Sequence, residues 1–133
     1  MLENYILDHH DVVPEPDYSK WEQWMETADL ILATTDNGVI RIKTLFLGVD
    51  QNFLGSGPPL LFETMTYLTD DFEEETQRLK VEFRGLECWR WSTWEEADTG
   101  HWKVAKKMFR RLDHFRGPLA DVIKYMRIDT PTS

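Results

Sequence analysis

The chain has 133 residues, of which 41% are hydrophobic, so it is long and apolar enough to fold as a single domain over residues 1–133. Its formal net charge of −9 argues against direct nucleic-acid binding, because simple nucleic-acid binders are basic. Residues 1–77 hold 16 Asp and Glu against 3 Lys and Arg, whereas residues 78–133 hold 8 against 12. This asymmetry fits two halves that pair across the fold, or an acidic surface that binds a basic partner.

No apolar run approaches the roughly 20 residues that a membrane-spanning helix needs. The N-terminal stretch is acidic where a signal peptide would carry Lys or Arg. Cys88 is the single cysteine, which excludes an intramolecular disulfide and fits a reducing compartment. We therefore expect a cytoplasmic protein without a membrane partner.

The first predicted elements are an arm and a short helix. Residues 1–16 read as an extended arm that ends at Pro14-Glu15-Pro16. Ser19 and Glu22 have the spacing of a capping box, which predicts a helix over residues 19–28. One apolar face of that helix would hold Trp21, Trp24, Met25 and Ala28.

Four strands are predicted next. Asn37-Gly38 is typical of a type I′ turn, so residues 30–35 and 39–49 should pair as a hairpin. In that hairpin, Ile31 and Ala33 should share a face with Ile40 and Ile42. The third strand is residues 60–68, with alternate residues on opposite faces, and the fourth is residues 79–91, with a bulge at Gly85.

Two helices should follow the strands. Ser92 or Thr93 can cap a helix over residues 93–112, with Glu95 or Glu96 closing the capping box. Its inward stripe comprises Trp94, Ala97, His101, Val104, Met108 and Leu112. A last helix should begin at Pro118, with Leu119, Val122, Ile123 and Met126 on its apolar face. Residues 128–133 should form a loose tail. The fold class is therefore α+β: a four-stranded, mainly antiparallel sheet with an N-terminal helix and two C-terminal helices.

The segment Gly48–Pro59 separates the second and third predicted strands. It lacks the GxxxxGK[ST] pattern of a phosphate-binding loop, and its prolines remove amide donors that such a loop uses. We interpret it as a wide connection between strands. At about a dozen residues it exceeds most hairpin loops, which leaves room for a binding role.

His101 is the sharpest candidate for chemistry, because it lies on the apolar stripe just after Gly100. The simpler interpretation is a core histidine bonded to a strand carboxylate such as Glu63. The alternative is a catalytic trio of Asp50, Glu63 and His101. No metal-ligand set or cofactor signature is present, so we expect neither a metal nor a cofactor.

Three further features are candidate binding sites. The acidic cluster in residues 69–77 should form an exposed loop, and its side chains are candidates for protein binding: Asp70, Asp71, Glu73, Glu74 and Glu75. His9-His10-Asp11 resembles a metal-binding fragment but is more simply a solvated, flexible run. Trp89 and Trp91 share one strand face, where they pack in the core or form a stacking surface.

Three segments resemble a group of small uncharacterised proteins encoded by bacteriophages and prophages: FLGVD at 46–50, GPPLLFETM at 57–65 and STWEEADTGH at 92–101. The matching positions are Phe46, Gly48, Asp50, Gly57–Met65, Ser92–Trp94, Ala97, Gly100 and His101. Gln51 stands where relatives often have His, which weighs against a metal site on the loop. The resemblance implies a protein of the infected cell's cytoplasm or a virion component, and it implies no activity.

Two functional hypotheses follow. The first is a non-catalytic phage accessory protein that acts by protein–protein binding, with a host factor as one candidate partner. The second is a small hydrolytic enzyme that uses Asp50, Glu63 and His101. The second requires these three side chains to converge in a concave pocket.

Overall fold

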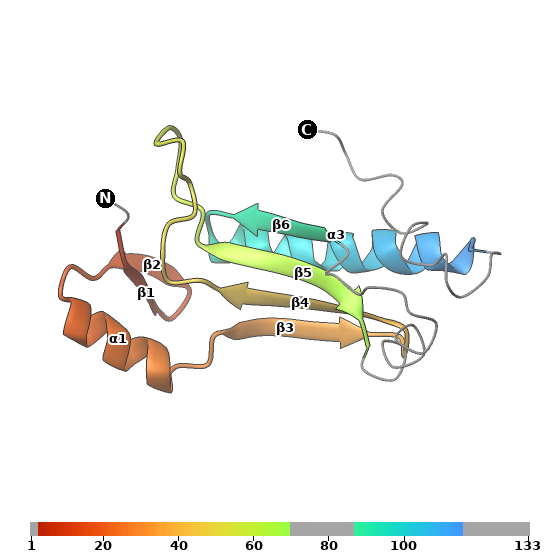
Figure 1. Cartoon of the computed structure of the whole chain (residues 1–133), viewed down its shortest axis with the longest axis horizontal. Helices are drawn as coiled ribbons and strands as arrows, with labels where there is room; N and C mark the ends of the chain where they lie inside the picture. Colours follow the sequence, from red (N-terminus) through yellow and green to blue (C-terminus); the bar gives the residue numbers. More distant parts are fainter. Residues whose placement is uncertain (1–2, 70–86, 116–133) are drawn as a thin grey trace, which may run out of the picture.

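The computed structural model describes residues 3–69 and 87–115. Its elements are β1 (Tyr5–Asp8), β2 (Asp11–Pro14), α1 (Tyr18–Thr27), β3 (Ile31–Asp36), β4 (Ile40–Phe46), β5 (Phe62–Leu68), β6 (Glu87–Trp91) and α3 (Trp94–Asp113). The main sheet is antiparallel with strand order β3-β4-β5-β6, and α3 packs across one of its faces (Figure 1). The α+β class and the four-stranded antiparallel sheet are as expected from the sequence.

Residues 5–14 form a hairpin rather than the expected extended arm. β1 and β2 pair in antiparallel register, from Tyr5 opposite Pro14 to Asp8 opposite Asp11. The turn depends on His9, whose φ of 58° is in the left-handed region. Non-glycine residues seldom adopt that conformation, so the residue types in this stretch do not mark the turn.

This hairpin lies beside α1 near one end of the main sheet (Figure 1), and hydrogen bonds join both elements to Gly48. The Tyr5 amide donates to the Gly48 carbonyl at 2.8 Å. The Trp21 indole N–H is shared between the carbonyls of Gly48 (3.1 Å) and Tyr5 (3.0 Å). One buried glycine therefore joins β1, α1 and the segment that follows β4.

The predicted apolar face of α1 is confirmed, but the helix begins at Tyr18, one residue earlier than expected. Asp17, not Ser19, is the N-cap, and its carboxylate accepts from the amides of Ser19 and Lys20. An Asp at the N-cap satisfies two amides that the helix leaves without partners. The proposed Ser19–Glu22 capping box was therefore wrong.

The β3–β4 hairpin forms, but its register differs from the expected one. A two-residue turn at Asn37-Gly38 would place Asp36 opposite Val39, two residues before its observed partner. Asp36 lies opposite Arg41 and Thr35 opposite Ile42. Gly38 has a φ of 90°, whereas Asn37 uses its side chain to accept from the amides of Val39 and Ile40. A shift of two residues preserves the faces, because side chains alternate with period two.

The inward faces were predicted correctly with one exception. Ala33 shares the helix-covered face with Ile42, but a bulge between Ile31 and Ala33 turns Ile31 to the other face, opposite Leu45, where it is 46% exposed. On β5 the even-numbered side chains are fully buried: Phe62, Thr64, Thr66 and Leu68. A bulge adds one residue and reverses the alternation, which period counting cannot detect.

α3 begins with the expected capping box, in which Thr93 and Glu96 satisfy each other's backbone amides. Ala97, His101, Val104 and Met108 of the predicted stripe are buried. Trp94 and Leu112 are only half-buried. The last predicted helix, the loose tail and residues 79–86 of the predicted fourth strand lie outside the described residues.

Candidate functional site

Asp50 organises the loop between β4 and β5. Its Oδ1 accepts the amide of Asn52 at 2.7 Å and the amide of Leu60 at 2.9 Å, so one carboxylate joins both ends of the loop. The Asn52 side chain then donates to the carbonyls of Ser56 and Pro58. Asp50 is thus a structural acceptor, and its contacts are with the loop backbone.

Glu63 lies on the sheet face opposite α3. Its Oε1 is 3.2 Å from Nε of Arg90 on β6, which is directly across the strand pair. The Glu63 side chain is 15% exposed. The contact that the sequence suggested between Glu63 and His101 is not formed, because the two side chains lie on opposite faces of the sheet.

His101 is fully buried beneath α3 in a chain of hydrogen bonds. Nδ1 is 2.7 Å from the Thr44 hydroxyl, and Nε2 is 3.0 Å from the Thr35 hydroxyl. Thr44 bonds in turn to Thr64 at 2.7 Å. Burial lowers the pKa of His101 below its ordinary value of 6.5, and the negative charge of Asp98 opposes that shift. His101 is therefore a neutral core histidine, bonded to threonines instead of a carboxylate.

The trio of Asp50, Glu63 and His101 is not assembled. Asp50 accepts hydrogen bonds from loop amides, Glu63 pairs with Arg90 on the outer face of the sheet, and His101 is enclosed in the core. A nucleophile and a base must be within hydrogen-bond reach of the same reacting atom. The structure therefore does not show the convergence of these three side chains that the enzyme hypothesis requires.

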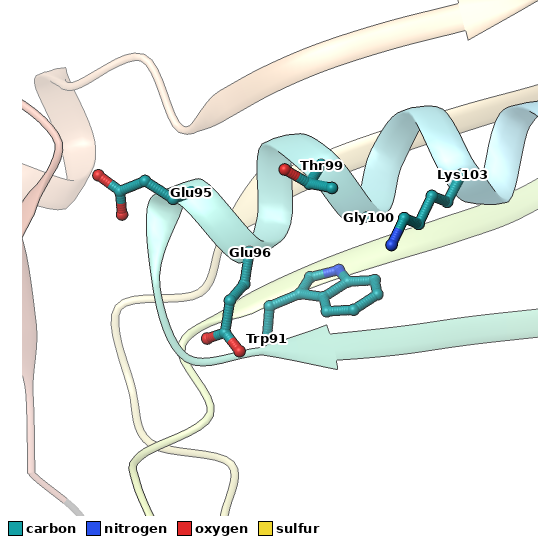
Figure 2. Close-up of a pocket in the computed structure, with 6 residues that line it drawn as sticks. All are labelled: Trp91, Glu95, Glu96, Thr99, Gly100 and Lys103. Carbon is teal, nitrogen blue, oxygen red and sulfur yellow. The ribbon is translucent and has the colours of Figure 1, made fainter.

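One pocket of about 390 Å³ opens beside the N-terminal half of α3, lined by Trp91, Glu95, Glu96, Thr99, Gly100 and Lys103 (Figure 2). The indole of Trp91 lies against Gly100 and donates to the Thr64 hydroxyl at 2.9 Å. Glu96 is engaged in the helix cap, and Glu95 points away from the indole, whereas the Lys103 ammonium points toward it. These side chains do not converge on one point, so the pocket lacks an acid–base pair.

The tip of the β4–β5 loop exposes two large apolar side chains. Phe53 is 68% exposed and Leu54 is 91% exposed, the largest exposed fraction among the large hydrophobic side chains of the described residues. The loop projects from the body of the molecule at the end of the sheet (Figure 1). The sequence analysis identified the loop but missed these two residues. Residue type alone does not show whether an apolar pair in a loop is buried or exposed.

The other candidate binding residues from the sequence lie outside the loop segment. His10 stacks on Trp94 of α3, with ring centroids 3.6 Å apart and planes 5° from parallel, and it remains exposed. Trp89 and Trp91 are partly buried and pack against the core, which is the first of the two alternatives given above. The acidic cluster from Asp70 to Glu75 lies outside the described residues.

In the part of the chain that the structure describes, no group of three or more His, Cys, Asp or Glu side chains is placed to hold a metal ion. Across the same residues, no helix is long and apolar enough to cross a membrane. No family model, no curated protein and no solved structure matches the chain.

Proposed function

We propose that this chain is a non-catalytic accessory protein of a bacteriophage or prophage, which acts by binding another protein. The recognition surface is the tip of the Gly48–Pro59 loop, and a host factor in the cytoplasm of the infected cell is a candidate partner. The observation that carries the proposal is the exposure of Phe53 and Leu54 on an internally hydrogen-bonded loop. The phage origin is supported by the sequence resemblance described above.

The loop supports this role because its shape is maintained without a partner. Asp50 and Asn52 supply the bonds that close the loop on itself. Gly55 and Gly57 have φ values of 74° and 83°, which allow the sharp return of the chain. A preorganised loop loses little conformational entropy on binding. More of the free energy gained by burying Phe53 and Leu54 therefore contributes to affinity.

A protein partner fits the tip better than a membrane surface does. Loops and helices that bind anionic bilayers combine apolar side chains with Lys or Arg. The segment from Gly48 to Pro59 has no basic residue and one acidic residue, Asp50, and the whole chain carries −9. An apolar anchor that enters a pocket of a partner protein, in contrast, needs no positive charge.

Site-specific photocrosslinking tests the proposal. A photoreactive benzoylphenylalanine placed at Leu54 should form a covalent adduct with one discrete protein in infected host cells. The same residue placed at Trp102, which is 55% exposed on α3, is the matched control and should not capture that protein. No adduct at Leu54, or the same adduct from both positions, would contradict recognition by the loop tip.

A further inference from the structure

β3 forms one edge of the main sheet. It pairs with β4 on one side, and no described strand or helix pairs with its other side (Figure 1). An unpaired edge presents a row of backbone N–H and C=O groups that can accept another strand.

The hydrogen-bonding pattern identifies which groups face outward. The Asn37 amide donates to the Ile40 carbonyl, and the Phe46 amide donates to the Leu30 carbonyl, so the even-numbered residues of β4 bond toward β3. Thr34 and Asp36 lie opposite Lys43 and Arg41, which are odd-numbered residues of β4. Bonded and non-bonded pairs alternate along an antiparallel ladder. The N–H and C=O groups of Thr34 and Asp36 therefore point away from the sheet.

The composition of this edge does little to prevent pairing. Natural edge strands are commonly protected by Lys, Pro, a covering element or a bulge. β3 has the sequence ILATTD, with no Lys and no Pro, and its bulge is confined to the first half of the strand. The stretch from Ala33 to Asp36 is regular, and threonine favours extended conformation.

We infer that β3 pairs antiparallel with β3 of a second copy of this chain, about a two-fold axis at Thr35. In this register Thr34 of each copy lies opposite Asp36 of the other, so the outward N–H and C=O groups of both pairs can exchange hydrogen bonds. The two main sheets, each with four strands among the described residues, then join into one. The contact is isologous and closed, which limits it to a dimer.

The charges near this edge are compatible with self-pairing in that register. Asp36 faces an uncharged threonine of the other copy, and each Asp36 has Nε of Arg41 of its own chain at 3.4 Å. Like charges directly opposite each other would destabilise a strand pair, and this register places none there. A partner with a basic edge strand would instead gain from the exposed Asp36, so that class of partner is the competing outcome. Because a strand pair alone buries little area, the dimer should be weak and dependent on concentration.

Light scattering after size exclusion tests the inference. At high protein concentration the wild-type mass should approach twice the 15.8 kDa of one chain, and it should fall toward 15.8 kDa on dilution. Thr34→Pro removes an outward N–H without removing a bond to β4, and should be monomeric at all concentrations. Thr34→Val keeps the N–H and should dimerise like the wild type.

Hydrogen exchange of the wild-type chain provides a readout that needs no variant to fold. The amides of Thr34 and Asp36 should exchange more slowly at high protein concentration than at low concentration, whereas buried amides of β4 should not change. A wild-type chain that stays monomeric throughout overturns the inference, and so does a dimer with no concentration-dependent protection at Thr34 and Asp36.

Discussion

A Cβ added to Gly100 would lie 2.3 Å from Cζ2 of Trp91, because the indole packs directly on the backbone of α3. Gly100→Ala should therefore destabilise the fold, although alanine is favoured in helices by about 1 kcal/mol. Overpacking of this kind typically costs about 1–3 kcal/mol. The Trp91 indole is also bonded to Thr64 and so has little room to move. After the helix gain is subtracted, denaturant unfolding should show a net loss of up to about 2 kcal/mol.

The adjacent Thr99→Ala is the matched control for that change. Thr99 is exposed on the same turn of α3, so its replacement should alter the free energy of unfolding by less than about 0.5 kcal/mol. If Gly100→Ala were more stable than wild type by the full helix preference of about 1 kcal/mol, the close packing of Trp91 on the helix would be refuted.

Gly48 and Gly55 separate the cost of backbone conformation from the cost of packing. Their φ values are nearly equal, 76° and 74°, but a Cβ at Gly48 would lie 2.6 Å from Sδ of Met25, whereas nothing lies within 4 Å at Gly55. Gly55→Ala should cost only the left-handed backbone, about 1–2 kcal/mol. Gly48→Ala should cost more in the same unfolding measurement, because the added Cβ also displaces the end of the Met25 side chain and would lie 3.3 Å from the hydrogen-bonded Nε1 of Trp21. Equal losses for the two variants would show that the junction at Gly48 is not tightly packed.

His101 should make the fold less stable in mild acid. Its pKa is lowered in the folded state by burial, whereas the unfolded chain has the ordinary value of 6.5. Below pH 6.5 the unfolded state therefore binds more protons than the folded state, and stability falls as the pH falls toward the folded-state pKa. Above 6.5 the contribution of the neutral ring is complete.

Unfolding by denaturant at about pH 7.5 and about pH 5.5 measures this effect. The loss between the two pH values should be smaller in His101→Asn, whose amide can bond to Thr44 but does not titrate. Identical losses in the wild type and in the variant would mean that His101 does not contribute to acid sensitivity.

The sequence predicted those parts of the fold that local patterns determine. The capping box of Thr93 and Glu96, the stripe of α3 and the alternation of β5 each depend on residues close in sequence. The turn at His9 and the bulge at Leu32 were missed, because neither residue type marks an unusual backbone. Both features belong to the pairing of one strand with another, which the preferences of single residues do not show.

The candidate site was predicted less well for a related reason. Alternation correctly placed Glu63 and Thr64 on opposite faces of β5, but it does not say which face a helix covers. α3 covers the face of Thr64, so His101 meets threonines while Glu63 meets Arg90. The loop from Gly48 to Pro59 was identified by its composition. The exposure of its tip depends on bonds made by Asp50 and Asn52, which only the folded structure shows.

The most direct test of the account is the affinity of the chain for the protein captured at Leu54. Titration calorimetry with that purified partner should show that Phe53→Ala and Leu54→Ala each raise Kd at least about tenfold, as expected for central apolar anchors. Trp102→Ala should leave Kd within about twofold. Because Leu54 is 91% exposed, its replacement should not alter thermal stability. Unchanged affinity in both loop variants, with the fold intact, would contradict the claim that this loop tip is the recognition surface.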